Sequence, residues 1–157
     1  MHSIAAIIAK SETTKALDER FVLAKSIQLP QGFGMVPLTE ALIEDITELG
    51  ANSSVPHEEF EYLNISIVQV LEELSFSGLI CYVETEYFGG DGGQSSIAWD
   101  KGKVIYGPTI SLNGNLNPIN DALKILGVQV LTLHDEFDEI GLGRNRSTDK
   151  WFEHGHS

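Results

Sequence analysis

The sequence has no lysine or arginine between Lys25 and Lys101, a stretch of nearly half its 157 residues. Acidic residues occur throughout the same stretch, and the whole chain has a formal net charge of −13 at pH 7. Binding to nucleic acid depends on basic side chains that neutralise phosphates, so this composition argues against a nucleic-acid partner. A surface field of one sign favours a basic protein as partner instead.

The sequence has a single cysteine, Cys81, which excludes an intrachain disulfide and favours a reducing compartment. No apolar run approaches the ~20 residues of a membrane-spanning helix. The apolar run at residues 4–9 is short and follows no basic segment, so it predicts a first β-strand rather than a signal peptide. We therefore expect a cytoplasmic protein with no membrane partner.

Residues 79–107 predict a three-stranded antiparallel meander. Two runs of strand-forming residues flank the Gly/Asp cluster at 89–93, which is typical of a hairpin with a wide loop. The turn at 100–102 leads into a third run, 103–106, and Gly107 and Pro108 are expected to close it. This meander is expected to form the centre of the sheet.

Apolar spacing and turn residues predict the remaining elements. Helices are expected at 12–21, at 40–49 after Thr39, near 66–76, and at 118–126 after Asn117; strands are expected at 4–9, 22–29 and 33–38, with 128–133 a further candidate. The order shows no regular βαβ rhythm, so the predicted class is α+β, with the meander in a mixed sheet and helices packed mainly on one face. Residues 1–152 are expected to form a single domain, and residues 153–157 a disordered tail.

Most acids of the lysine-free stretch lie in three predicted segments, a helix, the loop after it and the next helix. Glu40, Glu44 and Glu48 recur every four residues on the outer face of one helix, and no lysine there offsets their repulsion. Aromatic side chains commonly anchor interfaces. The predicted partner-binding residues are Glu40, Glu44, Asp45, Glu48, Glu58, Glu59, Phe60, Glu61, Tyr62, Glu72, Glu73 and Tyr87.

A second hypothesis rests on the hairpin. Glu84 and Glu86 share one face of a strand, and Asp91 follows in the loop. Such carboxylates can do acid–base chemistry or bind a cation, so a metal-binding or hydrolytic domain is the alternative function. Ion pairs from Arg144 or Arg146 to Glu84 or Glu86 are a further, purely structural, hypothesis.

Motifs for other chemistry are missing from the sequence. No histidine pair has zinc spacing, the glycine cluster lacks the lysine of a phosphate loop, and Ser95–Ser96 has no nucleophile-elbow context. We therefore predict no catalytic residue, no cofactor and a non-enzymatic function. A homo-oligomer whose acids merely face solvent remains an open alternative.

Three segments carry a resemblance to a known group. VETEYFGGDGGQSSIAW (83–99), NPINDALKILGV (117–128) and DEFDEIGLGRNRSTDKW (135–151) resemble a group of small acidic bacterial proteins of uncharacterised activity. In general character the chain is similar to immunity proteins of bacterial toxin systems, including contact-dependent growth inhibition. That likeness implies a cytosolic inhibitor that binds and blocks a basic toxin, often a nuclease; it assigns no binding residue.

Overall fold

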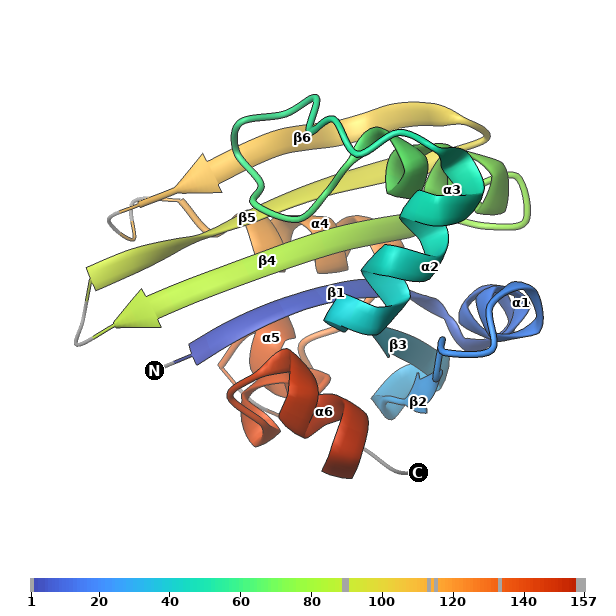
Figure 1. Ribbon diagram of the computed structural model, residues 1–157. Coiled ribbons are helices and arrows are strands. Elements are labelled where there is room, and N and C mark those ends of the chain that lie inside the picture. Colours follow the sequence, from blue (N-terminus) through green and yellow to red (C-terminus); the bar gives the residue numbers. More distant parts are fainter. Residues whose placement is uncertain (1, 89–90, 113, 115, 133, 155–157) are drawn as a thin grey trace.

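The computed structural model describes residues 2–88, 91–112, 114, 116–132 and 134–154. These residues form one six-stranded sheet with helices on both faces (Figure 1). All neighbouring strands are antiparallel, in the order β2-β3-β1-β4-β5-β6. The strands are β1 (His2–Lys10), β2 (Ile27–Gln28), β3 (Phe33–Pro37), β4 (Ile80–Phe88), β5 (Asp91–Asp100) and β6 (Lys103–Ser111). The helices are α1 (Ser11–Arg20), α2 (Glu40–Gly50), α3 (Ile65–Leu74), α4 (Pro118–Leu126), α5 (Glu136–Glu139) and α6 (Thr148–His154).

The central strand β1 is buried on both faces. Ala5 and Ile7 belong to a core shared with α1, α2 and α3, whereas Ala6 and Ile8 belong to a second core shared with α4 and α6. The α+β class and the meander are confirmed, but the meander forms one side of the sheet, with β6 at its edge, rather than its centre. The sheet is antiparallel throughout rather than mixed, and helices cover both faces rather than mainly one. Helices cover both faces because the unbroken apolar run at residues 4–9 leaves β1 no polar face to turn towards water.

Helices α2 and α3 begin where side-chain caps place them. Thr39 Oγ1 accepts a hydrogen bond from the N–H of Leu42 at 3.2 Å, and Asn64 Oδ1 accepts one from Ile67 at 3.0 Å. Helix α2 buries Leu42 and Ile46, so the acids of its other face point outward. None of the described helices is long and apolar enough to cross a membrane.

Three local predictions need correction. The strand expected at 22–29 shrinks to β2, because the N–H of Ser26 is bonded to Asp18 Oδ2 at 3.0 Å on α1. Strand β6 continues past Gly107 and Pro108, where a register shift against β5 accommodates both residues at the sheet edge. The expected tail starts later, because α6 includes residues 153 and 154; residues 155–157 lie outside the described residues.

Replacing a buried leucine of α2 tests the core under the acidic helix. Leu42→Ala should lower the free energy of unfolding by about 2–5 kcal/mol, because Leu42 is fully buried and its removal leaves a cavity. Leu49→Ala on the same helix, at a side chain 69% exposed, should change it by less than about 0.5 kcal/mol. Urea unfolding followed by circular dichroism measures both, and equal losses would contradict this packing.

Candidate functional site

A buried carboxylate, Glu84 on β4, holds the α2–α3 loop (residues 51–64) against the sheet. Its Oε1 accepts a hydrogen bond from the backbone N–H of Glu61 at 2.8 Å, and its Oε2 accepts one from the N–H of Tyr62 at 3.0 Å. Tyr82 donates its hydroxyl to the same Oε2 at 2.5 Å. Figure 1 shows the loop lying over β5 and β6, with its lower bend towards β4. Both oxygens of Glu84 are therefore engaged inside the protein.

Burial sets the protonation behaviour of this anchor. Glu84 is only 9% exposed, and desolvation raises the pKa of its carboxyl group. The hydrogen bonds from Glu61, Tyr82 and Tyr62 oppose that rise because they favour the charged form. A buried carboxyl group at this depth requires such donors, so the two backbone donors of the loop are held at Glu84.

The loop and the sheet enclose a hollow of about 250 Å³, which we call the acidic pocket. Carboxylates line it from the loop and β4, and apolar side chains of the β6 end line it as well; no lysine or arginine is among its lining residues. Partial burial is the largest cause of a raised pKa at Glu61, and the negative charge of Glu86 raises that pKa further. The two carboxylates are thus crowded without a cation between them. The lining residues used below are Glu58, Glu59, Glu61, Glu86, Ile110 and Leu112.

A second hollow of about 630 Å³ lies between α2 and α6, and we call it the α2–α6 groove. Its apolar lining is Ala5, Leu38 and Ile43, and its acidic lining is Glu40, Glu44 and Asp149. Tyr62 lines both this groove and the acidic pocket, so the two hollows adjoin. No lysine or arginine is among the residues that line the groove.

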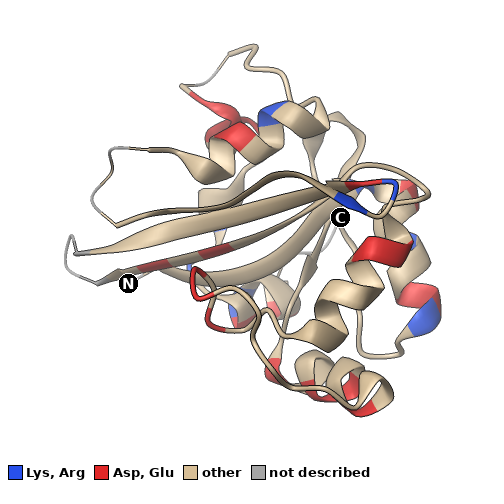
Figure 2. Cartoon of the chain, turned by 90° about the horizontal axis from the view of Figure 1, so that it is seen from above, with Lys and Arg blue, Asp and Glu red and all other residues tan. Residues whose placement is uncertain are grey.

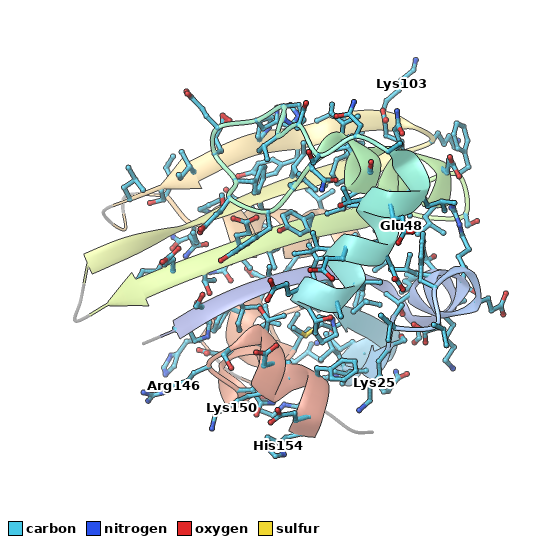
Figure 3. All side chains as sticks on the ribbon, viewed as in Figure 1. Lys25, Glu48, Lys103, Arg146, Lys150 and His154 are labelled. Carbon is cyan, nitrogen blue, oxygen red and sulfur yellow. The ribbon has the colours of Figure 1, made fainter. Side chains whose placement is uncertain are left out.

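Few acids of the lysine-free stretch are neutralised inside the molecule. In the part of the chain that the structure describes, Glu73 is the one acid of this stretch that pairs with a lysine or arginine, at 3.0 Å from Arg20. In Figure 3, Glu48 lies on α2 well away from Lys103 and from Arg146. Figure 2 shows further acidic residues on the other side of the sheet, so acidic residues are not confined to the α2 side.

The structure gathers most of the predicted partner-binding residues on one side of the sheet. Glu58, Glu59, Glu61 and Tyr62 line the acidic pocket, and Glu40 and Glu44 line the α2–α6 groove. Asp45 and Glu48 lie on α2 outside both hollows, and Glu72 and Glu73 lie on α3. Two aromatics are placed differently. Phe60 also lines the acidic pocket but is a core residue, 4% exposed and packed edge-on against Tyr82, and Tyr87 accepts a hydrogen bond from Gln94 on β5.

Asp149, Ile110 and Leu112 line these hollows but carry no local sequence signal for a site. Asp149 reaches the groove only because the start of α6 docks on β1. Ser3 pairs with Ser147 in an isolated bridge, and Thr148 Oγ1 accepts a hydrogen bond from the N–H of Ala5 at 2.9 Å. Such long-range contacts are invisible to periodicity and motif spacing.

The residues of the alternative function do not form a metal site as far as they are described. Among the described residues, no three His, Cys, Asp or Glu side chains are grouped so as to hold a metal ion. Glu84 would have to break its three hydrogen bonds to bind a cation, and the side chain of Asp91 lies outside the described residues. Glu84 and Glu86 also form no ion pair with Arg144, which lies over the Trp151 ring, or with Arg146 within the described chain.

Removing one oxygen acceptor at position 84 should loosen the loop. In Glu84→Gln the new amide N–H₂ faces backbone N–H donors, so we expect a loss of about 1–3 kcal/mol in unfolding free energy. The amide protons of Glu61 and Tyr62 should exchange faster with solvent. Glu48→Gln removes the same charge from the outside of α2 and is the matched control. Unchanged exchange at both amides would contradict the anchoring role.

The raised pKa values predict how stability depends on pH. For Glu84 and Glu61 the folded state holds the proton more tightly than the unfolded state. Their stabilising contribution to the free energy of unfolding is therefore fully present below the ordinary glutamate pKa of 4.5. It is lost as pH rises through the raised pKa values of the folded state. Thermal unfolding between pH 4.5 and pH 7 should show stability rising on acidification, with a smaller rise in a Glu61→Gln/Glu84→Gln variant. An identical slope in both proteins would refute this linkage.

Comparison with known proteins identified no relative of this chain. No protein-family model matches it, and no curated protein and no solved structure matches it. The assignment of function therefore depends on the acidic pocket, the α2–α6 groove and the charges around them.

Proposed function

We propose that this protein is a non-enzymatic, acidic binding protein of the immunity type, which binds a basic toxin domain and blocks its active site. One observation carries the proposal: the acidic pocket and the α2–α6 groove adjoin at Tyr62, and both are lined by carboxylates without any lysine or arginine. Crowded carboxylates of this kind gain stability when a partner supplies cations. The cytoplasmic location and the nuclease class of the toxin belong to the same proposal.

The inhibitory mechanism follows from charge and shape. A nuclease binds substrate phosphates through lysine and arginine side chains. The carboxylates of Glu58, Glu61 and Glu86 would take the place of those phosphates, so that substrate and inhibitor compete for the same cations. A negative face also steers a positive partner during diffusion and raises the association rate at low salt.

Apolar and aromatic side chains on the same face would supply affinity beyond the charges. Tyr62 is 42% exposed at the junction of the two hollows, and Ile110 and Leu112 are exposed beside the acidic pocket. A partly exposed tyrosine surrounded by charged residues is a common anchor of protein interfaces. Of the three predicted aromatic residues, Tyr62, rather than Phe60 or Tyr87, is the one on which we expect binding to depend.

Charge reversal on two faces tests this function. A basic protein captured from a lysate of the source organism would be identified, purified, and mixed with the protein at several salt concentrations by stopped flow. Glu58→Lys/Glu86→Lys should slow association by about tenfold or more at low salt. Asp138→Lys/Glu153→Lys changes the net charge equally on α5 and α6, and should slow it far less.

The outcome against the proposal is equally specific. If association does not depend on salt, and both double variants bind like the original protein, the acidic face is not the interface. Inhibition of the captured protein's nuclease activity, lost in Glu58→Lys/Glu86→Lys and kept in the control, would show that binding also blocks the toxin.

A further inference from the structure

The α2–α6 groove has an apolar floor between two acidic banks. Leu38 and Ile43 contribute to its apolar lining beside Ala5 of β1. Glu40 and Glu44, one helical turn apart, form the bank on α2. Asp149 forms the opposite bank on α6. The groove thus differs from the acidic pocket, where the carboxylates come from the loop and β4.

The groove continues towards Phe152, but its negative part ends before that residue. Thr39, Glu40, Glu44 and Asp149 also line an adjoining hollow of about 520 Å³, which reaches Phe152. There Lys25 donates to the backbone oxygen of Phe152 at 2.8 Å, and its Nζ lies 5.2 Å from the centre of the ring. The cation-free stretch therefore runs from Tyr62 to Asp149.

We propose that the α2–α6 groove binds an amphipathic basic helix of a protein partner. This inference rests on the proposed function and names the part of the partner that the groove accepts. A helix can present an apolar stripe to the floor while lysines or arginines on both flanks of that stripe reach the two acidic banks. An extended strand points alternate side chains towards and away from the floor, so it places few of them against both banks at once.

A second copy of this chain is the competing occupant. The chain has a net charge of −13, and the groove itself is lined by acids, so self-association would bring like charges together. Charge complementarity therefore favours a cationic segment over a second copy. Light scattering on the purified protein would reveal a dimer, and a dimer abolished by Glu44→Lys would assign the groove to a second copy and overturn the proposal.

The probe is a fluorescently labelled peptide of about 18 leucine and lysine residues, patterned to form an amphipathic helix about 27 Å long. Its control is a peptide of the same composition and charge, scrambled so that no apolar stripe forms. Fluorescence anisotropy at low salt should show the patterned peptide binding about tenfold more tightly than the scrambled one. Amide chemical-shift changes in the original protein should centre on Ala5, Leu38, Ile43 and Thr148.

Two substitutions on one helix separate docking in the groove from diffuse attraction. Glu44 lines the groove and Glu48 does not, yet both are exposed acids of α2, so Glu44→Lys and Glu48→Lys change the charge equally. Glu44→Lys should weaken binding of the patterned peptide by about tenfold, and Glu48→Lys by less than about threefold. Asp149→Lys should act like Glu44→Lys from the opposite bank.

Each other outcome overturns the inference. No binding of the patterned peptide, equal binding of both peptides, or equal losses in Glu44→Lys and Glu48→Lys would mean that the groove accepts no helix. The proposed function would survive those results if the captured basic partner still depended on Glu58 and Glu86. The proposed function alone would fail if the peptide bound as expected while association of that partner did not change with salt or with either double charge reversal.

Discussion

The acidic pocket depends on one internal interaction, the hydrogen bonding of the Glu84 carboxylate to the backbone of the α2–α3 loop. A buried carboxylate is costly unless donors compensate its charge. Two of its three donors belong to the loop, so the loop must lie over β4 for Glu84 to be satisfied. That position brings the carboxylate of Glu61 next to Glu86. An internal requirement of the fold thereby creates a crowded negative surface outside it.

The two-faced sheet supplies the rest of the geometry. Helices α2 and α3, which both lie in the lysine-free stretch, share one core with β1, so the outward-facing acids of these two helices lie on the same side of the sheet. The chain then crosses to the other face of the sheet for α4. The start of α6 finally docks beside the N-terminal part of β1, where Ser147 pairs with Ser3. The groove exists because α6, late in the sequence, docks on β1 opposite α2. Its two banks are more than one hundred positions apart in sequence, as Glu44 and Asp149 illustrate.

Local chemistry explains what could be predicted from sequence. Thr39 and Asn64 cap their helices through their own side chains, and Pro118 starts α4 even though the Asn117 side chain makes no capping bond. The features that the sequence does not predict involve side chains that accept backbone N–H hydrogen bonds from residues several or many positions away in the sequence. The sequence favours a strand at 128–133, but residues 128–132 form none, because Glu139 Oε1 accepts the N–H groups of Leu131 and Thr132 instead; residue 133 lies outside the described residues. Glu84 is likewise predicted as a site residue, because the sequence indicates which face of the strand it occupies but not the three donors that bind it.

The central claim is that carboxylates without cations form a negative face on the α2 side of the sheet. Paramagnetic relaxation of amide protons by small cationic and anionic nitroxides measures that potential directly, because each probe concentrates where the opposite charge lies. At low salt the cationic probe should enhance relaxation most at residues 57–62 and along α2, and the anionic probe should be depleted there. Equal effects of the two probes at those amides, or a uniform effect over the whole surface, would contradict the account.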